Sequence, residues 1–433
     1  MKSVEGKLGV MCVGLGAVTT TFITGTLMYR KGLGLPGGSV TQMAKIRVGR
    51  GEAKQYKKMG EIVALTDVKD MVFGAWDLFP ANGYEAAVNA DVLKAKDINP
   101  VREELEAILP IPAAFDPAFV SRLEGQGNNI KQGNRRQLAD QLREDIREFK
   151  AKNNCDRVVV LWVASTEKYI EYNEAVHGNL AAFEAAIDAN DCEHVSPSML
   201  YAYAAMKEGA PFVMGAPNLC IDMPAMWELA NEAGVPIAGK DFKTGQTLMK
   251  TVLAPMLRTR ALGLQGWFST NILGNRDGEV LDAPENFKTK EVSKLGVIDN
   301  ILSPEDQPEL YGDVFHKVRI NYYPPRGDNK EGWDNLDIFG WMGKDYGMQI
   351  KVDFLCRDSI LAAPLCLDLV VCADLALRNG LKGIQSWMSF FLKSPMYDFT
   401  KGEEPVHDLF QQYIMLKNQV RVLGGYEADE ELD

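Results

Sequence analysis

The sequence predicts an α/β fold, in which a doubly wound parallel sheet is interrupted by an inserted α+β domain. Three observations support this prediction. An apolar run, a glycine turn and a helical pattern open the chain in that order. Apolar runs then alternate with helical patterns as far as Thr247, where turn-rich segments begin, and helical patterns return near the C-terminus. We expect residues 1–247 and 365–433 to form one discontinuous domain, with residues 248–364 as the insertion.

Size and composition set the frame for this fold. A chain of 433 residues is long for one compact core, so two domains are expected. The net charge of −12 argues against a nucleic-acid partner, because binding to phosphates needs a basic face. Seven cysteines without CxxC spacing predict reduced thiols and a cytoplasmic location. The four histidines are dispersed, which makes a protein-built zinc site unexpected.

The N-terminal segment has two interpretations. Residues 8–28 carry no charge and follow Lys2 and Lys7, so a signal peptide or a membrane span is one alternative. The glycines and threonines in this segment suit hydrocarbon poorly, and no small-residue cleavage site follows. We therefore expect a strand over Lys7–Val13, a glycine turn and a helix from Ala17, with no membrane association.

This strand–turn–helix order is that of a Rossmann-type dinucleotide fold. Glycines let the backbone approach a pyrophosphate, and the helix N-terminus supplies N–H groups. GLGAVT alone is a weak motif because Thr19 stands where a third glycine is usual, so an ordinary strand–helix turn stays open. The acidic residue expected about 20 positions later is missing. Asp77 is the first plausible ribose ligand, although a strand-end aspartate that caps a turn explains it equally well.

The remaining elements follow from local patterns. Apolar runs predict strands at residues 61–68, 71–78, 156–165, 210–217 and 235–241. Helical spacing of apolar residues predicts helices at residues 135–153 and 197–209. Within the insertion, the patterns predict turns over 265–281, a helix over 286–302, a strand and turn over 316–329 and a strand over 348–356. Helical patterns resume from residue 359.

Five lysines at polar turns are the candidate chemical groups: Lys243, Lys290, Lys294, Lys330 and Lys393. Lys290 and Lys294 are four residues apart and share one face of a helix. Any single lysine is more often a solvated surface charge. Five that converged could bind a phosphate dianion, and their crowding would lower the pKa of at least one ammonium group. Spacing along the sequence does not show whether they converge.

At this point the sequence resembles the myo-inositol-phosphate synthase family. The segments GKDFKTGQT, NILGNRDG, FKTKEVSKLGVID, GDNK, DSILAAPLCLDL and FFLKSP occur in the order found in that family. GSVTQMAKIRVG, GAWDL, VVVLWVASTEKY and SPSMLYAYAAMKEGAPFVMGAP match it upstream, so the resemblance runs from about residue 9 to residue 400. It implies an NAD-dependent isomerase that converts glucose 6-phosphate to 1D-myo-inositol 3-phosphate without net redox change. It also implies a homotetramer that assembles mainly through the inserted domain.

Position by position, the resemblance implies three sets of site residues. NAD would bind Gly14, Gly16, Ala17, Val18, Asp77, Asp241, Lys243, Thr244, Asn275, Asp277 and Asp358. The substrate phosphate would bind Thr244, Gly245, Gln246, Lys294 and Lys330. Lys290 and Lys393 would flank the reacting carbons, and Lys294 and Lys330 would complete the catalytic set. A monovalent or divalent cation stays open, and so does any metal site.

The sequence departs from the family pattern at four positions. Ile272 and Arg276 stand where histidine and a second asparagine are usual. Lys240 replaces an acidic or neutral residue, and Leu248 replaces a lysine. Arg276 would add positive charge near the nicotinamide, which leaves the substrate preference open. Two other functions also stay open: a sugar-phosphate dehydrogenase that stops after one hydride transfer, and a non-catalytic NAD-binding scaffold.

Overall fold

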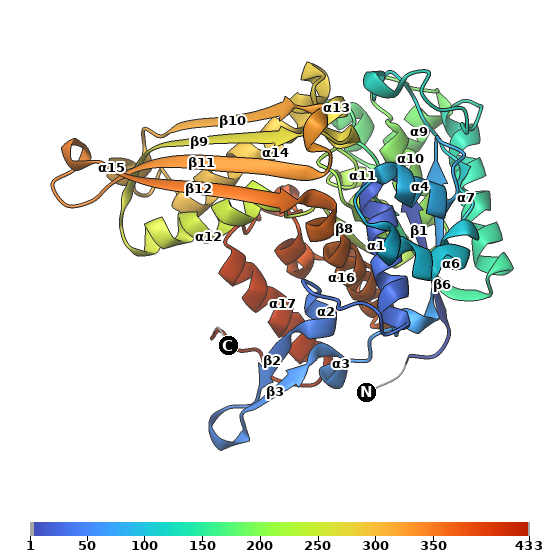
Figure 1. Cartoon of the computed structure of the whole chain (residues 1–433), viewed down its shortest axis with the longest axis horizontal. Helices are drawn as coiled ribbons and strands as arrows, with labels where there is room; N and C mark the ends of the chain where they lie inside the picture. The colour runs from blue at the N-terminus through green and yellow to red at the C-terminus, as the bar shows by residue number, and fades with distance from the viewer. Residues whose placement is uncertain (1–3, 432–433) are drawn as a thin grey trace.

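The computed structural model describes residues 4–431, except for the side chains of residues 292–295. Within that range a seven-stranded, all-parallel sheet forms the right-hand part of the molecule (Figure 1), in the order β13-β8-β7-β6-β1-β4-β5. Its strands are β1 (Lys7–Val13), β4 (Met71–Asp77), β5 (Ile111–Pro112), β6 (Cys155–Trp162), β7 (Phe212–Met214), β8 (Pro236–Gly239) and β13 (Gly383–Ile384). The chain winds outwards from β1 in both directions, so the predicted doubly wound fold is confirmed.

Helices cover both faces of this sheet. On β1, Val10 and Cys12 pack toward α1 (Ala17–Arg30) and α16 (Asp358–Arg378), whereas Met11 and Val13 pack toward α7 (Arg135–Lys152) and α10 (Pro197–Lys207). A parallel strand covered on both faces is apolar along its length, which is why residues 8–28 resemble a membrane segment. They form β1 and α1, as predicted.

Helix α16 is a core helix of this layer. It is long and apolar enough to cross a membrane by length and composition alone. However, 67% of its most apolar window is buried inside the protein, where the helix packs against α1 and β6.

A second, four-stranded sheet extends to the left in Figure 1. Its order is β10-β9-β11-β12, and only the β9–β10 pair is parallel. Leu257 and Ile298, on α12 (Gly245–Thr259) and α14 (Pro284–Leu302), pack on Trp267 and thereby cover one face. The strands are β9 (Gly263–Leu273), β10 (Phe315–Tyr322), β11 (Asn329–Phe339) and β12 (Met348–Arg357). They lie within the predicted insertion, whose boundaries stay a prediction.

Shorter elements complete the molecule. They are α2 (Val40–Met43), β2 (Lys45–Val48), β3 (Gln55–Lys58), α3 (Met59–Ile62), α4 (Gly83–Ala90), α5 (Ala95–Ile98), α6 (Arg102–Glu106), α8 (Glu174–His177), α9 (Leu180–Asp188), α11 (Pro224–Ala233), α13 (Arg276–Leu281), α15 (Pro308–Tyr311) and α17 (Leu409–Leu423). The segment that follows α1 is anchored to α16, because Ser39 and Thr41 donate hydrogen bonds to the buried Asp368.

Two local predictions are wrong. Residues 61–68 are not a strand: Glu61 caps the short helix α3 by accepting from the backbone N–H of Lys58, and Ile62 packs against α17 in a separate apolar cluster. Residues 265–281 are not mainly turns, because they contain most of β9 and the whole of α13. The other predicted helices and strands are present, with shifts at their ends.

Strand β11 was missed because its sequence is polar and contains glycine. Its unusual residues have tertiary partners that local propensity does not reveal. Asp334 is buried and accepts hydrogen bonds from Trp267 and Ser269. A β-carbon on Gly332 would lie 3.0 Å from Cγ of Gln246, so glycine lets this strand pack closely against α12.

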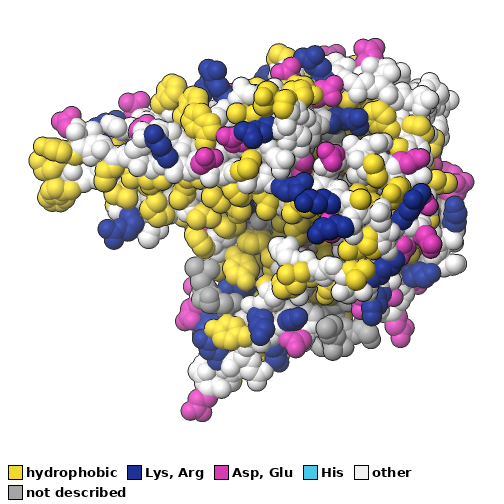
Figure 2. All heavy atoms as spheres, viewed as in Figure 1, with side chains coloured by type: hydrophobic (Ala, Val, Ile, Leu, Met, Phe, Trp, Pro, Cys, Tyr) yellow, Lys and Arg dark blue, Asp and Glu magenta, His cyan; other side chains and the backbone are white. Residues whose placement is uncertain are grey.

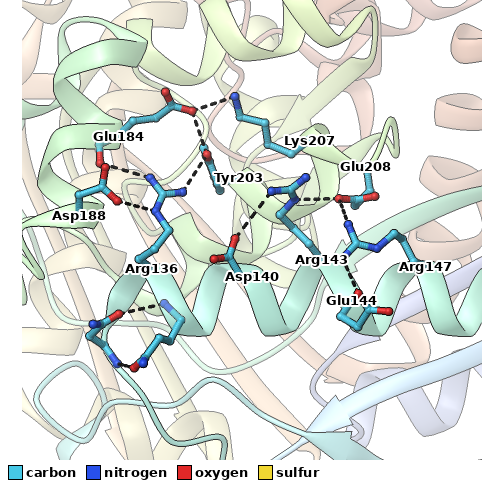
Figure 3. Close-up of polar contacts among 12 residues, drawn as sticks. Arg136, Asp140, Arg143, Glu144, Arg147, Glu184, Asp188, Tyr203, Lys207 and Glu208 are labelled. Carbon is cyan, nitrogen blue, oxygen red and sulfur yellow. Dashed lines mark hydrogen bonds and ion pairs between the residues drawn. The ribbon is translucent and has the colours of Figure 1, made fainter.

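An ion-pair network holds α7 against α9 and α10 on the outside of the parallel sheet (Figure 3). Arg136 pairs with Asp188 at 2.6 Å and donates to the hydroxyl of Tyr203 at 3.1 Å. Glu208 accepts from Arg143 at 2.7 Å and from Arg147 at 3.0 Å. These partly exposed ion pairs help to hold α7, whose apolar side is already buried against the sheet. They lie away from the cleft described next.

Candidate active site

A cleft of about 920 Å³ opens between the two sheets. Gly14 and Asp77 line it at the carboxyl ends of β1 and β4, while Asn275 and Lys290 line it from α13 and α14. The order of the parallel strands reverses between β1 and β6, and open α/β sheets bind ligands at such a point. The cleft therefore lies where a doubly wound fold places its cofactor.

The glycine turn forms one end of the cleft. Gly14 has φ +94°, and a β-carbon on it would lie 3.0 Å from Cα of Ala164, so glycine is required there. Gly16 precedes α1 without a side-chain cap, and a β-carbon on it would meet nothing within 4 Å. Ala17 and Val18 follow and also line the cleft. The first N–H groups of α1 lack helical partners, so this end fits a pyrophosphate.

Asp77 serves the glycine turn directly. Its carboxylate accepts the backbone N–H of Leu15 at 2.5 Å and that of Phe79 at 2.8 Å. Burial raises the pKa of Asp77, whereas these hydrogen bonds and the charge of Arg276 oppose the rise. These are the contacts of a strand-end aspartate that caps a turn. Since Asp77 also lines the cleft, its assignment to the ribose stays a prediction.

Two predicted catalytic lysines meet at one carboxylate oxygen at the other end of the cleft. Oδ1 of Asp241 accepts from Nζ of Lys290 at 2.8 Å and from Nζ of Lys393 at 3.3 Å, and all three residues are buried. Burial, together with the charges of Lys290 and Lys330, lowers the pKa of Lys393 to about 8. Burial acts the same way on Lys290, but there Asp241 and Asp277 together outweigh it and raise the pKa. The surroundings therefore favour the charged form of Lys290 and disfavour that of Lys393.

A second ion pair lies at the start of α12. Nζ of Lys330 is 3.2 Å from Oδ2 of Asp358, and the hydroxyl of Thr244 donates to Oδ1 of Asp358 at 2.9 Å. Burial would raise the pKa of Asp358, but Lys330 and Lys393 hold it below its usual range. Because the Thr244 hydroxyl is turned to Asp358, α12 has no side-chain cap. A β-carbon on Gly245 would lie 4.0 Å from Cε of Lys330, so the lysine stem lies beside this helix N-terminus.

Three predicted residues take other places. The amide group of Gln246 points into the second sheet, donating to the carbonyl oxygen of Thr270 at 2.8 Å, so only its backbone is available to a ligand. Lys243 does not line the cleft: its ammonium group donates to Oε1 of Gln412 on α17, and burial lowers its pKa to about 7. The side chain of Lys294 lies outside the described part of the structure.

Asp328 is a site residue that sequence reasoning missed. Its Oδ1 accepts from the amide of Asn275 at 3.1 Å and from the hydroxyl of Ser359 at 2.7 Å. It thus joins the start of α13 to the start of α16 beside Asp277, which also lines the cleft. The available signal was the Gly-Asp turn two residues before Lys330.

The four departures from the family pattern fall in different places. Lys240 pairs with Asp222 at 2.6 Å, outside the cleft lining. Ile272 and Leu248 do not line the cleft either. Arg276 does, and its Cζ lies 4.3 Å from the ring centroid of Phe79. Among the described residues, no group of three or more histidine, cysteine or acidic side chains is arranged to hold a metal ion.

A doubly wound sheet with a glycine turn at its switch point, facing paired buried lysines, defines an NAD-binding enzyme with a site for an anionic substrate. A family model described as myo-inositol-1-phosphate synthase matches residues 8–421. The chain belongs to this family, so the predicted family, fold class and NAD cofactor are confirmed.

Individual relatives agree over nearly the whole chain. It is 62% identical to inositol-3-phosphate synthase 1 of Bacteroides thetaiotaomicron, over 99% of this chain and 98% of that protein. It is 34% identical to inositol-3-phosphate synthase 1 of Oryza sativa subsp. japonica, over 98% and 87%. A crystal structure of inositol-3-phosphate synthase from Caenorhabditis elegans matches with a TM-score of 0.91 at 29% identity, over 99% and 88%.

Proposed function

We propose that the cleft converts D-glucose 6-phosphate to 1D-myo-inositol 3-phosphate, with NAD as a recycled cofactor. The observation that carries this proposal is the pairing of Lys290 and Lys393 on Asp241 in the same cleft as the glycine turn. Relatives named inositol-3-phosphate synthase support the same reaction. The enzyme is therefore an isomerase of inositol biosynthesis.

The start of α12 is the proposed phosphate site. Gly245 and Gln246 would supply backbone N–H groups that lack helical partners, together with the positive end of the helix dipole. Lys330 would supply a full charge beside them. Lys294 is one helical turn beyond Lys290 and completes the proposed set. A phosphate dianion needs such fixed positive groups in both ground and transition states.

The lysine end would handle protons and developing charge. NAD bound at the glycine turn supplies a hydride acceptor for carbon 5 and, after ring closure, a hydride donor. Lys393, with its pKa near 8, would take the proton from the carbon 5 hydroxyl and later return it. Lys290, whose charged form is favoured, would stabilise the enolate and alkoxide oxygens that form during enolisation and aldol closure. The proton that leaves carbon 6 would pass to the substrate's own phosphate, and the alkoxide formed on ring closure would take a proton back from it. Asp241 would hold both amines in place.

The buried charges argue against a non-catalytic scaffold. Taking lysine and aspartate side chains out of water costs several kcal/mol per ion, and apolar residues of similar size commonly replace such pairs without loss of stability. Lys290 and Lys393 are nevertheless buried and line one cleft, and the buried Lys330 pairs with Asp358, which lines it too. A sugar-phosphate dehydrogenase would use a similar site, and only the reaction product separates it from an isomerase.

The direct test is to incubate the purified chain with NAD and glucose 6-phosphate and to identify the phosphorylated product by NMR. We expect 1D-myo-inositol 3-phosphate. A keto sugar phosphate, formed together with an equal amount of NADH, would establish the dehydrogenase instead. Unchanged glucose 6-phosphate in the presence of bound NAD would favour the scaffold.

We further propose that the chain forms a homotetramer through the second sheet. Figure 2 shows hydrophobic side chains along the lower margin and at the tip of this sheet. Exposed residues there include Leu355 (60%), Trp341 (91%), Met342 (70%) and Tyr346 (65%). A second copy of the chain would cover this apolar surface. Sedimentation at micromolar concentration should give the mass of a tetramer, and a monomeric mass would exclude the assembly.

A cytoplasmic location is the remaining part of the proposal. All seven cysteines are free thiols, and six of them are buried. A chain with no disulfide suits a reducing compartment. Cell fractionation with an antibody to the chain tests this location, and recovery in a membrane or secreted fraction would contradict it.

A further inference from the structure

Arg276 is the one departure from the family pattern that lines the cleft. It is the first residue of α13, and its guanidinium group lies over the ring of Phe79, which follows β4 of the parallel sheet. The cation–π contact therefore joins α13, which follows the second sheet's strand β9, to the segment after β4 at the glycine-turn end of the cleft. Since Phe79 is two residues beyond Asp77, Arg276 lies on the side of the cleft predicted to hold the adenosine ribose, whereas the family resemblance implied a place near the nicotinamide.

Arg276 is exposed to solvent, and its guanidinium group has no hydrogen-bond partner within the described part of the chain. Three basic residues line the cleft, and two of them, Lys290 and Lys393, are bound to Asp241. Among the described residues, no side chain or backbone group forms a hydrogen bond or an ion pair with the Arg276 guanidinium, which carries five N–H donors. Acidic residues outnumber basic ones in the cleft lining. Within the described lining, Arg276 is therefore the cation that is not paired with a carboxylate and could meet an anionic ligand.

The glycine turn lacks a positively charged side chain of its own. The segment from Gly14 to Thr19 contains no basic residue, so a pyrophosphate bound there would receive only backbone N–H groups from its own sheet. Leu15 in this turn donates to the Asp77 carboxylate, and the charge of Arg276 acts on that same carboxylate. These contacts place the arginine and the turn around one region of the cleft.

We propose that Arg276 binds the pyrophosphate of NAD from across the cleft, as a positioning residue that joins the second sheet to the cofactor. This inference rests on the proposed binding of NAD at the glycine turn. A planar guanidinium group matches phosphate oxygens in pairs, and Phe79 holds it in place before the ligand arrives. The asparagine usual in the family carries no charge, so this chain gains a charge-assisted contact.

The test is calorimetric titration of the full-length chain and its Arg276→Gln variant with NAD, ADP-ribose, adenosine, NADP and 2′-AMP. We expect the variant to lose about ten- to a hundredfold in affinity for NAD and ADP-ribose, the range for one charge-assisted hydrogen-bonding partner. Affinity for adenosine should not change. Arg276→Lys should lose less, because it keeps the charge, and Phe79→Leu should show an intermediate loss. Arg319→Gln, at an exposed arginine on β10, is the matched control and should bind like the unaltered chain.

Each possible outcome supports or overturns a specific statement. If Arg276→Gln keeps full affinity for NAD, the inference is wrong and the proposed function stands. If the unaltered chain does not bind NAD, the proposed function fails, and this inference fails with it. If the variant loses affinity only for NADP and 2′-AMP, the arginine contacts a 2′-phosphate and the pyrophosphate assignment is wrong. Thermal unfolding of every variant shows whether it has folded.

Discussion

The two ends of the cleft differ in the chemical groups that line them. The glycine end consists of backbone: a glycine with positive φ at Gly14, an uncapped helix N-terminus at Gly16 and one aspartate that fixes the turn. The lysine end consists of buried side-chain charges, with Lys290 and Lys393 sharing Asp241. A cofactor that is chemically unchanged after each turnover needs a binding surface that is complementary to it in shape. A substrate whose charge moves during reaction needs ionisable groups in a site shielded from water.

The lysine end should be the more sensitive to mutation in turnover. Replacing Lys290 or Lys393 with alanine should lower turnover by about two to four orders of magnitude, the range for a lost acid–base or oxyanion partner. Affinity for glucose 6-phosphate should change little, because these lysines are assigned to charge that appears only during reaction. Single-turnover rates and substrate titration measure the two effects separately. Near-normal turnover in both variants would contradict the proposed mechanism.

The phosphate site should show a different pattern. Lys330→Ala should weaken binding of glucose 6-phosphate by about ten- to a hundredfold, because the phosphate is charged in ground and transition states alike. Part of the loss should appear in turnover if the phosphate also positions carbon 6. The variant removes the ion-pair partner of Asp358 and leaves it the hydrogen bond from Thr244, so its thermal stability should also fall.

A double variant, Lys330→Met with Asp358→Asn, separates these two effects. It removes both charges and should recover stability while substrate binding stays weak. Recovery of substrate binding together with stability would show that Lys330 is structural.

The glycine end should respond to shape instead of charge. Gly16 has a φ angle that alanine adopts readily, and there is free space around a β-carbon at this position. The Gly16→Ala substitution should therefore not affect folding. The added methyl group would occupy the space assigned to the pyrophosphate, and NAD affinity should fall by about tenfold, since close backbone approach is lost. Gly14→Ala should cost about 1–3 kcal/mol of stability as well, because Gly14 has positive φ and contacts Ala164. Unchanged NAD affinity in Gly16→Ala would mean that the cofactor lies elsewhere.

The smallest effect is a shift in pH dependence at the lysine end. If the neutral amine of Lys393 accepts the proton, turnover should rise with pH through about 8 and then level off. The negative charge of Asp241 raises the pKa of Lys393, so Asp241→Asn should move this rise to lower pH. Asp222→Asn, which removes a carboxylate paired with Lys240 outside the cleft, is the control and should leave the profile unchanged. A rise at the same pH in Asp241→Asn would exclude Lys393 as the titrating base.

The two ends also differ in how far the sequence could predict them. The glycine end was predictable because its signal is local: β1, the turn and α1 follow one another within residues 7–30. At the lysine end, the sequence supplied the lysines through family resemblance but not their pairing. Asp241 and Lys393 are far apart in the chain, and their contact depends on the fold.

Two further misses have the same cause. Burial lowers the pKa of Lys243, but its ammonium group donates to Gln412 on α17 and does not line the cleft. Strand β11 contains residues that disfavour strands, and the second sheet stabilises it through contacts such as those of Asp334. Long-range partners decided both outcomes, and local patterns do not encode them.

The central claim is that the cofactor end stays unchanged over each turnover while the lysine end converts the substrate. The most direct measurement follows absorbance of reduced nicotinamide while glucose 6-phosphate is consumed, with NAD added at far less than the substrate concentration. The account predicts a flat absorbance and many molecules of 1D-myo-inositol 3-phosphate formed for each NAD. Absorbance that rises in step with substrate loss, and a reaction that stops when NAD is exhausted, would contradict it.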